Sequence, residues 1–137
     1  MRRFLLAVDD SDASARSVRV ASELGRGAGC EVLIVHVRDK ELCCKGPAWE
    51  KPMLCTPENL VAGLVGELRE AGVNARGEIH SSLNHREADE ILATARDVGA
   101  DLIVAGWRPR RTLGGILQKS TGQKIAERSS IPFLLVP

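Results

Sequence analysis

The residues from Gly106 to Gly122 combine features of a site that binds anions. The segment reads GWRPRRTLGGILQKSTG, with glycines that free the backbone, hydroxyls that can donate, and several cations. It leads into a predicted helix at about Ser120, and the unpaired N–H groups of a helix N-terminus attract anions. It is not a Walker A loop, because the spacing Gly-x-x-x-x-Gly-Lys-Ser/Thr is absent. The alternative interpretation is a solvated basic loop in which Gly114–Gly115 forms a turn.

Asp9 is a second candidate, because it follows the apolar run Phe4–Val8 directly. A carboxylate at such a position can contact a ribose hydroxyl or a metal-bound phosphate. The simpler interpretation is that Asp9 caps the helix expected next, for which Ser11 is the natural N-cap. No histidine stands in a context that suggests a base for Ser11 as a nucleophile, so we expect no catalytic residue.

Apolar runs and helical stripes alternate along the chain and predict the elements that position these residues. Continuous apolar runs indicate strands at 4–8, 32–37, 102–105 and 131–136, with a weaker edge strand at 73–80. Helical spacing indicates four helices between them. The first helix is expected from Ser11 to the glycines at 25–29, and the second from Thr56–Glu58 to Gly72. The third is expected from a capping box at Asn84–Glu87 to Gly99, and the fourth from about Ser120 to Arg128.

This βαβαβαβαβ order predicts an α/β protein with a five-stranded parallel sheet and helices on both faces, a doubly wound sandwich. Ligands of such sheets bind beyond the carboxyl ends of the strands, where the strand order reverses. The residues to examine for function are therefore those that follow the strands: Asp9–Ser11, Val37–Asp39, and the segment from Gly106 onward.

Length and composition place the chain among globular domains. Its 137 residues, 44% hydrophobic and 27% charged, favour a single domain over residues 1–137 and exclude a disordered class. The apolar runs are shorter than the ~20 residues of a membrane span, and Asp9 ends the first run too early for a secretory signal. We therefore expect a cytoplasmic protein with no membrane partner.

From Gly106 onward, six basic residues stand against one acidic residue, while the net charge of the whole chain is only +1. Such a local excess indicates a small anion site rather than a nucleic-acid surface, and no recognition motif is present. The cysteines Cys30, Cys43, Cys44 and Cys55 have no zinc spacing, so we expect no metal and interpret them as inert or oxidisable thiols. The proline-containing segment 38–56 is either a lid or partner-binding surface, or an insertion without function.

Three stretches together resemble the universal stress protein family of the UspA type. They are LAVDDS at residues 6–11, GADLIVAG at 99–106 and SIPFLLV at 130–136, and the resemblance covers about residues 3–136. It implies a Rossmann-like, adenine nucleotide alpha-hydrolase-like fold and a non-enzymatic stress-response role. It also implies a cytoplasmic homodimer paired through Ile131, Phe133 and Leu135 of the last strand.

The phosphate motif of the ATP-binding members, Gly-x-x-Gly-x9-Gly-Ser/Thr, is degenerate in this chain. Gly106 and Ser120 match its ends, but Pro109 and Lys119 replace two glycines. Pro109 removes a backbone donor, and Lys119 adds a side chain where the backbone should approach a phosphate. A lost N–H contact costs about 1.5–3 kcal/mol, and a well-placed lysine returns a similar amount. These two effects leave the sign of the sum open, and with two of the three glycines replaced we expect a weaker or different anionic ligand rather than tight ATP binding in the usual geometry.

The resemblance also implies that Asp9 and the backbone of Val37 hold ribose and adenine. The complete candidate binding set is Asp9, Val37, Gly106, Arg108, Lys119, Ser120 and Thr121. ATP or another phosphate-bearing molecule is the candidate ligand. The alternative is a ligand-free interaction module that acts through the 38–56 loop, and a slow nucleotide hydrolase is the least favoured interpretation.

Overall fold

The computed structural model describes residues 2–9, 12–26, 29–39, 56–83, 86–107, 111–113, 116–118 and 120–137. Several predictions of the sequence lie outside these residues. They concern the Ser11 cap, the 38–56 loop beyond Asp39, the thiols Cys43, Cys44 and Cys55, Asn84, Arg108, Pro109, the Gly114–Gly115 turn and Lys119.

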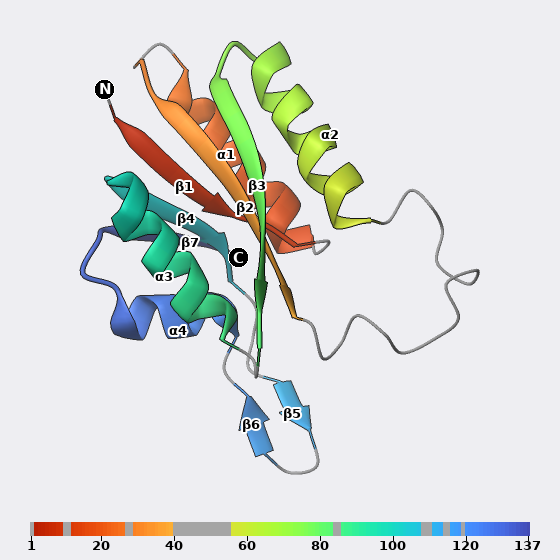
Figure 1. Ribbon diagram of the computed structural model, residues 1–137, viewed down its shortest axis with the longest axis vertical. Helices are drawn as coiled ribbons and strands as arrows, with labels where there is room; N and C mark the ends of the chain where they lie inside the picture. The colour runs from red at the N-terminus through yellow and green to blue at the C-terminus, as the bar shows by residue number, and fades with distance from the viewer. Residues whose placement is uncertain are drawn as a thin grey trace.

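Five parallel strands form the central sheet, as predicted (Figure 1). They are β1 (Arg3–Ala7), β2 (Glu31–Asp39), β3 (Asn74–Ser82), β4 (Leu102–Gly106) and β7 (Phe133–Val136). The spatial order is β3-β2-β1-β4-β7, and each neighbouring pair is parallel. The weak strand predicted at 73–80 is β3 and lies at an edge of the sheet, which explains its low apolar content.

Two helices cover each face of this sheet. Figure 1 shows α1 (Asp12–Gly25) and α2 (Pro57–Glu70) on one side, and α3 (Glu87–Val98) and α4 (Thr121–Arg128) on the other. Among the described residues, no helix has the length and apolar character needed to cross a membrane.

Local signals set most helix ends. Thr56 caps α2, with its Oγ1 accepting a hydrogen bond from the N–H of Asn59 at 3.2 Å. Gly72 and Gly99 follow α2 and α3 with positive φ angles of 84° and 66°, which favour glycine. The predicted capping box at Asn84–Glu87 is wrong, because α3 begins at Glu87 itself and Arg86 occupies the N-cap position without a side-chain bond.

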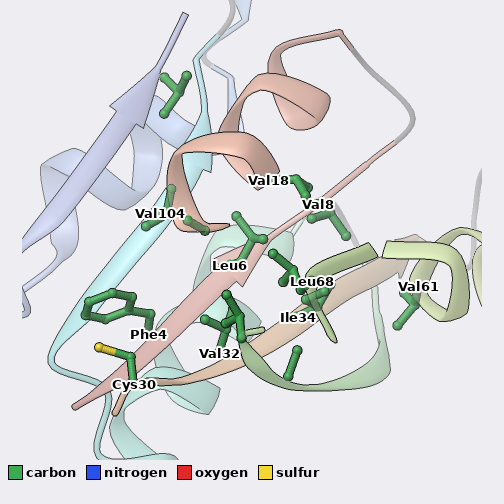
Figure 2. Close-up of a cluster of buried hydrophobic side chains, with 14 residues drawn as sticks. Phe4, Leu6, Val8, Val18, Cys30, Val32, Ile34, Val61, Leu68 and Val104 are labelled. Atoms are coloured by element: carbon green, nitrogen blue, oxygen red, sulfur yellow. The ribbon is translucent and has the colours of Figure 1, made fainter. Parts of the chain in front are cut away.

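The core consists of two apolar layers separated by the sheet. Phe4, Leu6 and Val8 of the first strand segment face α1 and α2, where they join Val18 and Leu68 (Figure 2). The alternate residues of β1, Leu5 and Ala7, face α3 and α4 in a second cluster. The other buried members of this cluster are Leu33, Val35, Ala88, Ile91, Leu92, Ala95, Ala100, Ile103, Ala105 and Ile125. The unbroken apolar run of β1 is thus explained by burial on both faces. Cys30 is a free, buried thiol of the first layer.

The basic segment after β4 contains a β-hairpin, where the sequence predicted only a loop. Strands β5 (Arg111–Leu113) and β6 (Ile116–Gln118) pair antiparallel, with Thr112 opposite Leu117. Branched residues at these positions suit an extended backbone, a signal that the neighbouring glycines and cations obscured. The hairpin is a separate two-stranded sheet beyond the carboxyl edge of the main sheet, whose parallel order is unaffected (Figure 1).

Candidate functional site

The strand order reverses between β1 and β4, the two central neighbours from which the chain leaves in opposite directions. Ala7 pairs with Ala105 in their parallel ladder, so the residues that follow the two strands emerge side by side. Those residues are Asp9 after β1, and Gly106 at the end of β4. The structure therefore brings two of the predicted binding residues to the position where open α/β sheets bind ligands.

Gly106 allows the N-terminus of α1 to contact the end of β4. A Cβ atom at Gly106 would lie 3.0 Å from the backbone carbon of Ala13 and 3.1 Å from the backbone nitrogen of Ser14. Both atoms belong to the first turn of α1 and cannot rotate away as a side chain could. A side chain at position 106 would therefore displace the helix from the sheet.

Helix α4 reaches the same residue from the other face of the sheet. A Cβ atom at Gly122, in the first turn of α4, would lie 2.7 Å from the carbonyl oxygen of Gly106. Two helix N-termini thus converge on Gly106, and each directs the positive end of a helix dipole toward this edge. Such a convergence favours an anionic group at the edge of the sheet.

Ser120 and Thr121 lie at the beginning of α4, as the sequence predicted. Ser120 is the N-cap: its Oγ accepts from the N–H of Gln123 at 3.2 Å, and Gln123 Oε1 accepts from the N–H of Ser120 at 3.0 Å. This reciprocal capping box was readable from the Ser-x-x-Gln spacing but was not predicted. The cap uses the Ser120 hydroxyl as an acceptor, so its hydrogen can still be donated to a ligand.

Asp9 is half-buried and is held by its backbone. Its N–H donates to the Oγ of Ser14 at 2.9 Å, a bond that joins the end of β1 to the first turn of α1. The adjacent Val8 N–H donates to the carbonyl of Val35 in β2 at 3.0 Å, which continues the β1–β2 ladder. These bonds fix the backbone at the switch point on the β1 side.

Val37 lies one strand further along the same edge. Val35 pairs with Ala7, so Val37 and Asp9, each two residues later, stand level on neighbouring strands. Val37 packs against the layer covered by α3 and α4 and is opposite His80 of β3. The described candidate residues Asp9, Val37, Gly106, Ser120 and Thr121 therefore share one edge, and Val37 is separated from Gly106 by the width of β1.

Arg38, next to Val37, faces away from this layer. Its guanidinium forms a hydrogen-bonded ion pair with Glu58 in the first turn of α2, on the opposite side of the sheet. The pKa of the Glu58 carboxyl is lowered, first by its own backbone N–H and then by the hydrogen bond from Arg38. Arg38 is thus engaged with α2. Within the described ranges, no group of three or more His, Cys, Asp or Glu side chains is arranged to hold a metal ion.

The fold and this edge define an open α/β domain whose strand order reverses between β1 and β4. The model of the universal stress protein family matches residues 1–137. The chain belongs to the universal stress protein family.

Individual relatives agree with this assignment over almost the whole chain. Universal stress protein YxiE of Bacillus subtilis is 26% identical over 98% of this chain and 97% of its own length. A universal stress protein solved in complex with cAMP superposes with a TM-score of 0.71 at 21% identity, covering 99% and 96% of the two chains. The universal stress protein of Archaeoglobus fulgidus in complex with dAMP has a TM-score of 0.66 at 22% identity, covering 100% and 98%.

Proposed function

We propose that this protein is a non-enzymatic stress-response protein of the cytoplasm whose carboxyl edge binds an adenine nucleotide. The observation that carries the proposal is the convergence of the N-termini of α1 and α4 on Gly106. The nucleotide phosphate would lie at Gly106, Ser120 and Thr121, the ribose at Asp9, and the base at the backbone of Val37. The cAMP and dAMP complexes of the two related folds support the ligand class.

The ligand we favour is a nucleotide with one phosphate, rather than ATP. Pro109 and Lys119 stand where two glycines of the ATP-binding motif would free the backbone for a longer phosphate chain. Arg108 and Lys119 belong to the proposed set as charge partners of the phosphate. A single phosphate needs only the helix N-termini at Gly106 and one or two donors from these side chains.

Calorimetric titration with AMP and with ATP, each with and without magnesium, tests this function. We expect AMP to bind at submillimolar concentration and ATP to bind more weakly. The variant Ser120→Ala should weaken AMP binding about three- to tenfold, because one hydroxyl donor is lost. Thr56→Ala is the matched control, since Thr56 is also an N-cap hydroxyl but belongs to α2.

Two negative results together would contradict the nucleotide proposal. If neither nucleotide gives heat at millimolar concentration, and mass spectrometry of the freshly purified protein finds no retained nucleotide, the nucleotide proposal is wrong. The protein would then be the ligand-free interaction module, acting through the 38–56 loop.

We further propose a homodimer that pairs through Ile131, Phe133 and Leu135. Strand β7 lies at the edge of the sheet with β4 as its neighbour, so its outer backbone groups can bond a second strand. Phe133 and Leu134 are 40% and 36% exposed, which provides apolar surface at this edge. Light scattering of Phe133→Glu should give a monomer, whereas Leu83→Glu, an exposed leucine after β3, should leave the dimer intact. A wild-type monomer at micromolar concentration would contradict the proposal.

A further inference from the structure

His80 lies at the carboxyl end of the edge strand β3 and bonds two carboxylates at once. Its Nε2 is 3.1 Å from Oε2 of Glu78 on the same strand, and its Nδ1 is 2.9 Å from Oε1 of Glu90 on α3. The N-terminal part of α3 lies beside this end of β3 (Figure 1). We call Glu78, His80 and Glu90 the His80 cluster. It joins the carboxyl end of β3 to the first turn of α3, the next element along the chain.

The geometry requires a charged imidazole. An ionised carboxylate only accepts hydrogen bonds, so each ring nitrogen of His80 must donate one. A neutral imidazole carries a single N–H and would leave one nitrogen lone pair facing a carboxylate oxygen. Both bonds can therefore exist together only while His80 is an imidazolium. The two carboxylates bond different ring nitrogens, so they do not surround a common point as metal ligands would.

The balance of effects on His80 favours this charged form. Burial lowers the pKa of the imidazole, but the hydrogen bonds and negative charges of Glu78 and Glu90 outweigh it, so the pKa is raised above its ordinary value of 6.5. The side chain of His80 is 27% exposed, so water can supply or remove its proton.

Three other charged side chains on the elements around the cluster are paired elsewhere. On β3, Arg76 is paired with Glu31 at 3.1 Å, nearer the amino end of the strand. On β2, Arg38 faces the opposite side of the sheet and bonds Glu58, while the side chain of Asp39 lies outside the described residues. On α3, Asp89 is paired with Arg128 of α4 at 2.8 Å. His80 itself bonds two carboxylates, while Arg86 and Glu87 at the start of α3 carry charges of opposite sign.

Apart from the ladder with β2, which continues to Ser82, the His80 cluster is the side-chain link between this end of β3 and α3 among the described residues. The strand has β2 as its neighbour on one side, and the buried hydroxyl of Ser82, two residues after His80, has no hydrogen-bond partner. His80 itself stands opposite Val37 in the β2–β3 ladder. We propose that His80 is a positioning residue: as an imidazolium it ties β3 to α3, and the loss of its proton loosens the end of the sheet beside Val37.

A consequence for ligand binding rests on the proposed function. If the backbone of Val37 holds the base of a nucleotide, loosening β3 makes this backbone less well ordered. Nucleotide affinity should then decrease as the pH rises through the titration of His80. The structural part of the inference does not need a ligand and can be tested without one.

The first experiment uses the ligand-free protein. The imidazole resonances of its three histidines are titrated by NMR, and His80 is assigned from the spectrum of His80→Gln. We expect His80 to titrate above 6.5, and Glu78→Gln and Glu90→Gln each to lower its pKa. Glu67→Gln, an exposed glutamate of α2 on the other face, is the control for the change in net charge and should have no effect.

The same samples report the loosening directly. Amide-exchange protection factors for residues 78–82 should fall about three- to tenfold between about pH 6 and pH 9, as the imidazolium is lost. In His80→Gln protection should be low at both pH values. A His80 that titrates at or below 6.5, or an equal pH dependence in wild type and His80→Gln, overturns the inference.

AMP titration at both pH values separates this inference from the proposed function. A wild-type affinity that falls as the pH rises, with no such change in His80→Gln, supports both. An affinity that is equal at the two pH values, despite loosening seen by exchange, overturns the link to Val37. If AMP binds at neither pH value, the proposed nucleotide function is wrong. The NMR and exchange results still decide the role of His80 in that case.

Discussion

The carboxyl edge of the sheet is held in two different ways at its two ends. At the switch point, Gly106 packs closely against the N-termini of α1 and α4, and most of the nearest atoms are backbone atoms. At the β3 end, the connection to α3 depends on the His80 cluster, whose side chains are partly exposed and titratable. The comparison indicates that the proposed phosphate end of the site is fixed by packing, whereas the proposed base end depends on the protonation of one residue.

The largest effect should come from a methyl group at the switch point. Gly122→Ala places a Cβ 2.7 Å from the carbonyl oxygen of Gly106, a backbone atom that cannot move aside alone. We expect the free energy of unfolding to fall by about 1–3 kcal/mol, the usual cost of overpacking. Urea denaturation measures it.

A glycine in open space provides the control for this substitution. Gly66 lies in α2, and a Cβ atom there would have nothing beyond the backbone of its own helix within 4 Å. Gly66→Ala should therefore stabilise the protein by up to about 1 kcal/mol through helix propensity. If Gly122→Ala and Gly66→Ala changed the free energy of unfolding in the same direction, close backbone contact would not distinguish the switch point from the rest of the fold.

Two N-cap hydroxyls allow the helix end at the switch point, that of α4, to be compared with the helix end of α2. Ser120→Ala should reduce the free energy of unfolding by about 1 kcal/mol, because the N–H of Gln123 loses its acceptor. Thr56→Ala removes the corresponding bond to Asn59 and should cost a similar amount. Thermal unfolding of both variants checks this equality. A much larger loss for Ser120→Ala would mean that its hydroxyl supports the switch point beyond capping α4.

At the β3 end, the comparison predicts stability that depends on pH. The pKa of His80 is raised in the folded protein, so its contribution is fully present below 6.5 and is lost as the pH rises through the higher folded value. We expect His80→Gln to cost about 1 kcal/mol or less at low pH, since the carboxylates are partly screened by water, and nothing at high pH. Urea denaturation across this pH range measures the difference. A pH-independent cost would mean that His80 acts only through packing.

Most of the fold could be predicted because its signals are local. Apolar runs such as Phe4–Val8 mark strands buried on both faces, and Thr56, Gly72 and Gly99 mark helix ends by their own conformational preferences. The hairpin after β4 was missed because cations and glycines dominate its sequence. The α3 cap was misplaced because Asn84–Glu87 has the spacing of a capping box although the helix begins later.

The site was predictable only in part, because contacts between distant segments leave no local signal. The sequence shows that residues 106 and 122 are glycines, but the carbonyl contact between them depends on how α4 approaches β4. Likewise, Glu78 and His80 share a face of β3 by their spacing, whereas Glu90 joins them only through the packing of α3. Asp9, Val37 and Ser120 were placed at the correct edge because strand ends in parallel sheets are predictable from element order.

The smallest effect should come from the ion pair that joins α3 to α4. Asp89 of α3 and Arg128 of α4 are 2.8 Å apart, but their side chains are 52% and 51% exposed. Water and salt screen such pairs, so Asp89→Asn should lower the free energy of unfolding by less than about 0.5 kcal/mol, and less still in molar salt. Denaturation at low and high salt checks both values. A loss comparable to that of His80→Gln would show that α3 is held mainly from the α4 side, and the two ends of the edge would then not be independent.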